Sequence, residues 1–272
     1  MGEWFDKYSG GVRPGVFIDS GAYSAASIGV TIDLDAYIGW LHANAGHVAT
    51  YSVLDSIGDH QKTGENQRIM EEAGLHPLPC FHVGEPWTVL EAYLERYDYV
   101  ALGGMVPHST NKSLGSWIAR AFDYAHASRH RGTPVYHGFG MTNMTHARQH
   151  RWRSIDSSRV SSGVRFGNLQ VWDTKLSKLR ALVFHKPADL QQLVWQLRDI
   201  GINPAWFTSS AEATRDRRLM VGGATIAAME SHLRGVHTVD DPSLRFKVYL
   251  ADSAANGFKA YEEGAQLWKN AR

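Results

Sequence analysis

Short apolar runs alternate with amphipathic segments through the first 157 residues, and this alternation limits the fold more than any other feature of the sequence. The apolar runs typical of strands are six: GVFID, VATYSVLD, PLPCFHV, YVALGG, PVYHGFG and RSIDSS. Helical patterns separate them, and regular strand–helix alternation predicts a parallel sheet with helices outside it. Six repeats favour a closed (β/α)8 TIM barrel over an open sheet. We expect one barrel domain over residues 1–272.

Two of the intervening segments carry clear helix signals. Over 34–46, apolar residues recur at helical spacing on one face, and Asp33 is a suitable N-cap. Over 63–74, we expect Thr63 to cap a second helix and Gly74 to end it.

After Ser157 the alternation loosens. Residues 165–186 predict an antiparallel hairpin appended to the barrel, and 188–201 an amphipathic helix. The segment PAWF (204–207) is a candidate for a short seventh strand.

The cysteine content and the charge limit which cellular compartment and which binding partners the sequence favours. Cys80 is the only cysteine, so an intrachain disulfide and a cysteine-rich zinc site are both excluded. The N-terminus has no secretory signal pattern, and we expect a cytoplasmic location.

The formal net charge is +1. However, the segment 129–153 holds four histidines and no acid, together with Arg129, Arg131, Arg148, Arg151 and Arg153. This local positive charge suits phosphates, although a solvated basic face is an equally good interpretation.

Polar residues or glycines follow every predicted strand. The set comprises Asp19 and Ser20, Asp55, His82, Gly103 and Gly104, His137 and Asp156. In a parallel barrel, the carboxyl ends of the strands share one rim, where catalytic groups collect. An Asp after one strand is usually only a helix cap, but three acids and paired glycines on one rim favour a site.

These residue types suit a flat polar heterocycle. Carboxylates accept hydrogen bonds from the N–H groups of a base edge, glycine amides bind its carbonyl, and an aromatic ring such as Tyr23 stacks on its face. A further carboxylate could attack a sugar carbon and hold a covalent glycosyl intermediate.

With these motifs assembled, the sequence resembles the tRNA-guanine transglycosylase superfamily. The likeness is greatest to its compact phage-type branch, which inserts 7-deazaguanine bases into DNA. The matching stretches are FIDSGAYSA, YSVLDSIGDHQKTGENQRIMEEAGLHPLPCFHVGE, YDYVALGGMV, HGFGMT and SIDSSRV with GVRFGN, in the family's order over residues 16–173.

The resemblance implies a role for each matching residue. Asp19 would accept a proton and contact the base. Ser20 would help orient Asp19, and Tyr23 would stack on the base. Asp55 would recognise the guanine-like edge. Gly103 and Gly104 would offer backbone amides, while His82 and His137 would contact ligand at the rim. Asp156 would be the nucleophile that attacks C1′. The basic segment 129–153 would cradle DNA phosphates.

The implied reaction exchanges guanine in DNA for a 7-deazaguanine base and needs no cofactor or metal. A duplex would have to flip the target nucleotide out. The tRNA enzymes hold a structural zinc with three cysteines and a histidine, which this chain cannot supply, so DNA is favoured over tRNA. For a phage protein, the location would be the host cytoplasm.

The position of one strand departs from the family. Members usually open with a strand similar to KVYLA, whereas here KVYLAD begins at Lys247. We therefore hypothesise a circular permutation in which residues 245–272 supply the first strand and helix, next to the Asp19 strand and the last strand. Asp252 and Asn256 would then reach the rim. The alternative is that 245–272 are peripheral.

Three other functions stay open. The same exchange could act on tRNA, or the chain could be a non-catalytic subunit that binds nucleic acid or a base. The retention of Asp19 and Asp156 argues against a non-catalytic role. A metal-dependent hydrolase is the third, but the chain has neither His-x-His after a strand nor His-Glu-x-x-His.

Overall fold

The computed structural model describes residues 15–108, 112–128, 134–141, 143–183, 186–209, 211–237, 245–251 and 257–272. They form two compact units, one ending at Phe139 and the other beginning at Gly140. Each unit is described by itself. The expected α/β class with parallel strands is confirmed in both units.

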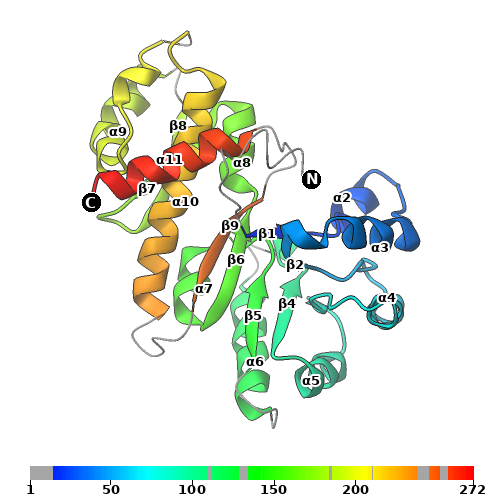
Figure 1. The fold of residues 1–272 in the computed structure, drawn as a ribbon. Helices are drawn as coiled ribbons and strands as arrows, with labels where there is room; N and C mark the ends of the chain where they lie inside the picture. Colours follow the sequence, from blue (N-terminus) through cyan, green and yellow to red (C-terminus); the bar gives the residue numbers. More distant parts are fainter. Residues whose placement is uncertain are drawn as a thin grey trace. The chain divides into compact units, whose positions relative to one another are not determined.

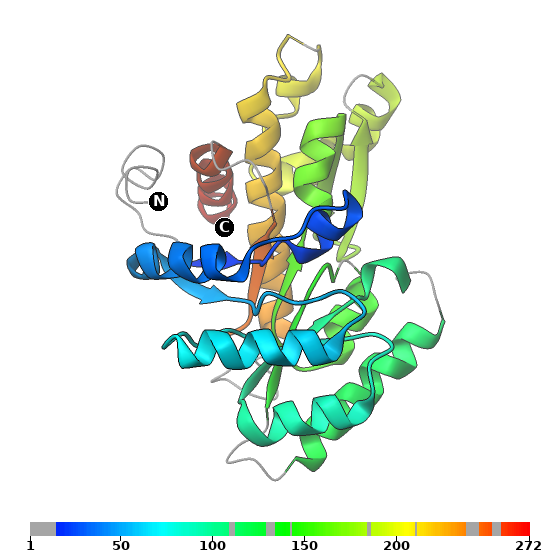
Figure 2. The same cartoon turned by 90° about the vertical axis from the view of Figure 1, so that its right-hand side faces the viewer.

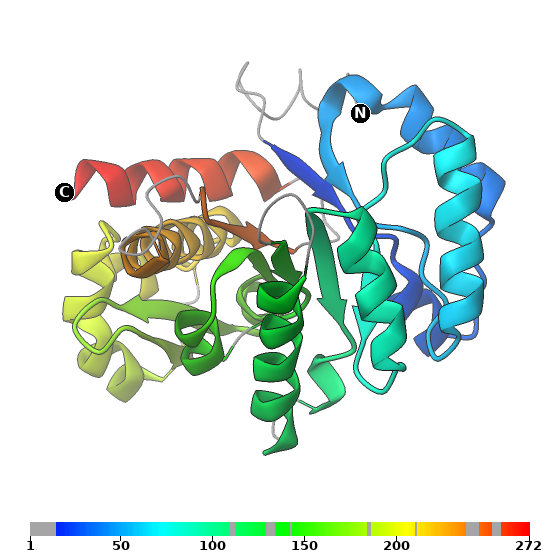
Figure 3. The same cartoon turned by 90° about the horizontal axis from the view of Figure 1, so that it is seen from below.

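The first unit alternates strands and helices in the predicted order (Figure 1). Its strands are β1 (Val16–Ile18), β2 (Val48–Tyr51), β3 (Cys80–His82), β4 (Tyr99–Gly103) and β5 (Val135–Gly138). Its helices are α2 (Ala22–Ser27), α3 (Leu34–Ala43), α4 (His60–Glu72), α5 (Trp87–Arg96) and α6 (Ser113–Ala127), with short 3-10 turns η1 (Ala45–His47) and η2 (Val106–His108). In Figure 3, the helices follow one another from α3 (blue) to α6 (green) along the outside of the strands.

All strands of the first unit run parallel. β1 pairs with β2, and β3, β4 and β5 pair in sequence order. A parallel bridge between Ser52 and Leu78 links the end of β2 to the segment before β3. The strand series therefore follows the chain, as repeated strand–helix–strand units require.

The strand series of the first unit is strongly curled. Phe17 of β1 and His137 of β5 stand at the two ends of the series, yet their ring centroids lie 4.6 Å apart. Four spacings of about 4.8 Å would separate the end strands of a flat sheet by about 19 Å. The side chains on the inner face thus meet across the curl, although the pairings among the described residues do not close a barrel.

Local capping confirms one predicted helix start and corrects another. The Asp33 side chain accepts a hydrogen bond from the Ala36 amide, as an N-cap does. The second helix starts earlier than predicted, because Asp59 rather than Thr63 is its N-cap. The Thr63 hydroxyl is buried and hydrogen-bonded to Ser56 and to the Asp59 carbonyl. Gly74 ends this helix with a φ of 79°, a left-handed conformation that suits glycine.

The second unit combines a parallel strand pair, a hairpin and long helices. Its strands are β6 (Trp152–Ser157), β7 (Asn168–Asp173), β8 (Lys178–Val183) and β9 (Lys247–Leu250). Its helices are α7 (Met144–Gln149), α8 (Arg159–Phe166), α9 (Pro187–Asp199), α10 (Arg215–His237) and α11 (Phe258–Asn270). The hairpin expected over 165–186 is formed by β7 and β8, which pair antiparallel.

The segment PAWF is not a strand, and this prediction was wrong. Residues Pro204–Phe207 form the 3-10 turn η3, because the Asn203 side chain accepts a hydrogen bond from the Ala205 amide and Pro204 fixes the first helical position. β6 is therefore the last strand of the regular series. β9 lies parallel beside it, with Val248 opposite Ile155. This is one of the two neighbours that the permutation hypothesis requires; Asp252 and Asn256 lie outside the described residues.

Helices α10 and α11 lie side by side in the second unit (Figures 1 and 2). Glycines allow the close approach, since a Cβ at Gly223 would lie 1.8 Å from the Tyr261 carbonyl oxygen and one at Gly264 would lie 1.9 Å from that of Met220. Within the described part of the chain, no helix combines the length and the apolar character that crossing a membrane requires.

Candidate functional site

Three strand ends of the first unit meet at the carboxylate of Asp55. The Ser20 hydroxyl, just after β1, donates to Oδ1 of Asp55 at 2.6 Å. Nε2 of His82, at the end of β3, lies 3.0 Å from Oδ2. Both oxygens of a largely buried carboxylate, 13% exposed, are therefore engaged. The expectation that polar residues after the strands converge is confirmed for Ser20, Asp55 and His82.

Ser20 is itself held by residues that the sequence did not single out. Its amide donates to the Ser52 hydroxyl at 2.9 Å, and the Tyr37 hydroxyl donates to the Ser52 carbonyl at 3.0 Å. The Ala22 amide donates to the Ser20 hydroxyl oxygen at 3.2 Å. Gly21, with a φ of 77°, turns the chain from β1 into α2. The Ser20 hydroxyl is thus fixed on the Asp55 carboxylate before any ligand arrives.

Glu85, just before α5, orients His82. One oxygen of Glu85 accepts from the His82 amide at 3.0 Å, and the other lies 3.1 Å from Nδ1 of the same residue. The Glu85 side chain is 7% exposed, so this pairing takes place out of bulk solvent. The imidazole is therefore clamped between Glu85 on one nitrogen and Asp55 on the other.

The same neighbours set the protonation of His82. Burial disfavours the charged imidazole, but Cys80, Asp55 and Glu85 around the ring outweigh burial and raise the pKa of His82. Burial raises the pKa of the Cys80 thiol to about 11, so the thiol is neutral at neutral pH. The two carboxylates therefore supply the negative charge that holds a proton on each ring nitrogen.

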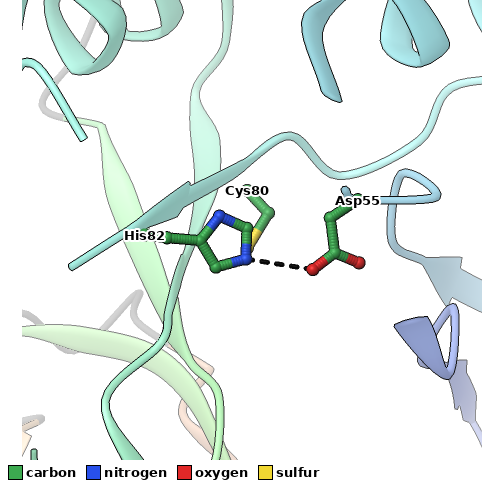
Figure 4. Close-up of side chains that lie close together, drawn as sticks. All are labelled: Asp55, Cys80 and His82. Atoms are coloured by element: carbon green, nitrogen blue, oxygen red, sulfur yellow. Dashed lines mark hydrogen bonds and ion pairs between the residues drawn. The ribbon is translucent and has the colours of Figure 1, made fainter. Parts of the chain in front are cut away.

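Cys80 is buried on β3 and borders the site. Its Sγ lies 3.5 Å from Nε2 of His82 (Figure 4). One ligand atom from each of Asp55, Cys80 and His82 lies within 4.8 Å of the others. Among the described residues, this group brings donor types that bind metal ions close enough together that they could hold one.

Gly103 leaves the space that this group fills. A Cβ at Gly103 would lie 2.8 Å from Cδ2 of His82 and 2.9 Å from Sγ of Cys80. Gly104 has a φ of 69°, a conformation that suits glycine. The structure thus gives Gly103 a packing reason to be glycine, and the roles of both amides toward a base remain predictions.

Asp19 and Asp55 have pKa values shifted in opposite directions. Burial raises the pKa of Asp19, the nearby charge of Asp55 raises it further, and the Gly21 amide opposes both. The shift of Asp19 is tempered by solvent, because this residue is exposed. Burial acts against ionisation of Asp55 too, but His82 and Ser20 outweigh it and lower the pKa of Asp55. Neighbouring carboxylates with opposite shifts are typical of sites that divide proton transfer from fixed binding.

Tyr23 and His137 differ in their exposure to solvent. Tyr23, on α2, is 56% exposed and free to present its ring to a ligand. His137 is fully buried, edge-on to the rings of Phe17 and Phe139 at 4.6 and 4.5 Å. Burial lowers the pKa of His137 to about 3, so the imidazole is neutral. The His137 ring packs on the inner face of the curled sheet, and its contact with a ligand remains a prediction.

Asp156 lies on β6 and belongs to the second unit. Its Oδ1 accepts a hydrogen bond from the Gly140 amide at 2.5 Å. Gly140, the last residue of HGFG, has a φ of 64°, a left-handed conformation that suits glycine. The carboxylate is thus oriented by backbone within its own unit.

The basic segment is only partly described. Arg129 and Arg131 lie outside the described residues. Arg148, Arg151 and Arg153 are half-buried, and the Arg148 guanidinium donates to the Ser177 carbonyl. Their contact with DNA remains a prediction.

Comparisons with family models, curated proteins and solved structures found no match. The resemblance to transglycosylases therefore rests on the motifs quoted above. The site in the first unit can offer a fixed carboxylate acceptor, a second carboxylate with a raised pKa, and a charged imidazole held between acids.

Proposed function

We propose that this chain exchanges guanine in DNA for a 7-deazaguanine base through a covalent aspartyl-glycosyl intermediate. The observation that carries the proposal is the meeting of the residues after β1, β2 and β3 at one carboxylate, with Asp19 beside it. Ser20, Asp55 and His82 all come from the motifs that resemble the family. The curled parallel series and β9 beside β6 support a permuted (β/α)8 barrel as the scaffold.

In the proposed reaction, a carboxylate oxygen of Asp156 attacks C1′ of the target nucleotide. The bond between C1′ and N9 breaks, and guanine leaves with the electron pair and takes up a proton. Asp19 then removes the N9 proton of the incoming base, whose nitrogen attacks C1′ and releases Asp156. One glycosidic bond replaces another, so no external energy source is needed.

Binding and catalysis divide between the groups. Asp55, kept ionised by His82 and Ser20, accepts hydrogen bonds from the guanine-like edge. Tyr23 supplies an exposed ring for stacking. Arg148, Arg151 and Arg153, with Arg129 and Arg131, contact the phosphates.

The test mixes the full chain with guanine-containing DNA and a labelled 7-deazaguanine base. We expect incorporation of label and a covalent protein–DNA adduct on a denaturing gel, and we expect Asp156→Ala to abolish the adduct. Asp19→Asn should slow exchange about 100-fold or more, the scale of general acid–base catalysis. Asp35→Asn, an exposed acid on α3, is the matched control and should exchange at the native rate.

The substrate alternatives are separated in the same assay. Incorporation into tRNA but not into single- or double-stranded DNA would favour the tRNA reaction. Binding of DNA without incorporation into either nucleic acid would support the non-catalytic alternative and refute base exchange. An adduct that persists in Asp156→Ala would refute the role of Asp156.

A further inference from the structure

We infer that Asp55, Cys80 and His82 form a binding site for a divalent transition-metal ion of the zinc type. The inference does not depend on base exchange, because it follows from the donor atoms and their spacing. Thiolate, imidazole and carboxylate together are a ligand set that suits Zn²⁺. Three protein ligands leave a fourth position for water or another small ligand.

Two of the three distances between the ligand atoms are close to those around a tetrahedral ion. With bonds of about 2.0 Å to nitrogen and 2.3 Å to sulfur, the two ligand atoms of such an ion lie about 3.5 Å apart. Sγ of Cys80 and Nε2 of His82 are 3.5 Å apart. Nε2 and Oδ2 of Asp55 are 3.0 Å apart, against about 3.3 Å around zinc. The third pair, one ligand atom each from Cys80 and Asp55, lies within 4.8 Å, against about 3.5 Å around zinc, so these two side chains would move toward the ion by up to about 1 Å.

The surrounding residues hold the ligands as the partners of metal ligands do. Glu85 contacts Nδ1 of His82 at 3.1 Å and so directs Nε2 toward the other two ligands. A carboxylate on the far nitrogen of a ligating histidine fixes the ring and raises its basicity. Ser20 holds the other oxygen of Asp55 at 2.6 Å. The ligand His82 of β3 and the ligand Asp55 are therefore each held by a further side chain, Glu85 for His82 and Ser20 for Asp55.

Without an ion, Nε2 of His82 carries a proton that faces Oδ2 of Asp55. The ion would replace that proton, and the Cys80 thiol would lose its own on binding. Gly103 leaves room for the side chains of both ligands on β3, because any Cβ there would collide with Cys80 and His82.

The test titrates the metal-free full chain with Co²⁺ and then displaces it with Zn²⁺. Cys80 is the only cysteine in the chain, so a thiolate-to-cobalt charge-transfer band in the near ultraviolet reports this site alone. We expect a band that saturates at one equivalent of Co²⁺ and is lost on addition of Zn²⁺. Histidines on the surface can bind Co²⁺ but cannot produce this band.

Two matched variants sharpen the result. Glu85→Gln keeps all three ligands but removes the charged partner of His82, and it should weaken Co²⁺ binding about 10- to 100-fold. Glu91→Gln, an exposed acid on α5, should leave the affinity unchanged. Asp55→Asn should change the spectrum and weaken binding.

The native spectrum decides the question even if a variant fails to fold. Absence of the band in the native chain would overturn the inference. An unchanged affinity for Co²⁺ in both Asp55→Asn and Glu85→Gln would also overturn it, because Cys80 would then bind cobalt without the other residues of this site. Base exchange is measured separately on DNA, so failure of one proposal leaves the other standing.

Discussion

Buried His137 should make the first unit sensitive to acid. The imidazole lies on the inner face of the curled sheet, edge-on to Phe17 and Phe139, with no exposed surface. Burial lowers its pKa from the ordinary value of 6.5 to about 3. In the unfolded chain, the same imidazole regains its ordinary pKa. The folded state therefore excludes a proton that the unfolded state binds.

The sign and size of the effect follow from this difference. Because the folded pKa is depressed, the stabilising contribution is fully present above pH 6.5 and is lost as the pH falls toward 3. Each unit of pKa difference corresponds to about 1.4 kcal/mol, which sets an upper limit of about 5 kcal/mol. Between pH 6 and pH 4, the folded state should lose about 2.5 kcal/mol from this residue alone.

The variant His137→Leu isolates this contribution, since leucine fills a similar volume and does not titrate. Its repacking cost, about 1–3 kcal/mol, does not depend on pH. Hydrogen exchange of peptides that cover β4 and β5, corrected for the intrinsic exchange rate, measures the free energy of opening at each pH. We expect the native chain to lose about 2.5 kcal/mol more than the variant between pH 6 and pH 4. Equal pH dependence in the two chains would refute a neutral, buried His137.

Two glycine substitutions test the packing. Gly103→Ala should lower the free energy of unfolding in urea by about 1–3 kcal/mol, because the added Cβ would lie 2.8 Å from His82. Its control, Gly39→Ala at an exposed position of α3, should be neutral or stabilising in the same assay. Gly223→Ala should destabilise by a similar or larger amount, because backbone cannot move aside as a side chain can. Its control, Gly235→Ala on the same helix, has open space around it and should leave the thermal midpoint unchanged or raised. A Gly223→Ala variant as stable as Gly235→Ala would contradict the close approach of α10 and α11.

Periodicity and capping residues predicted most of the elements, because both act within a few residues. The errors arose where two local signals competed. Asp59 and Thr63 are both acceptable helix caps, and only the structure shows that the Thr63 hydroxyl is used by Ser56. PAWF is apolar enough for a strand, but Asn203 and Pro204 begin a helical turn there.

The site residues at strand ends could be predicted from the sequence. Those that contact residues far away along the chain could not. Ser20, Asp55 and His82 each follow or end a strand, so parallel pairing alone brings them to one edge. Tyr37 gave no polar signal, because it sits on the apolar face of α3 while its hydroxyl reaches Ser52. Cys80 stands two residues before His82 in the same strand, so the alternation of side chains already places both on one face. The sequence does not show that Asp55, which follows a different strand, lies close to both of them.

The two acids of the first unit illustrate how neighbours, rather than residue type, assign roles. Asp55 has a charged imidazole and a hydroxyl on its oxygens, so it stays ionised and its geometry is fixed. Partial desolvation and the negative charge of Asp55 both raise the pKa of Asp19 above its ordinary value. A proton acceptor works best when its pKa approaches the operating pH, whereas a recognition group works best when it never titrates. Under the proposed base exchange, proton removal therefore falls to Asp19 and recognition to Asp55.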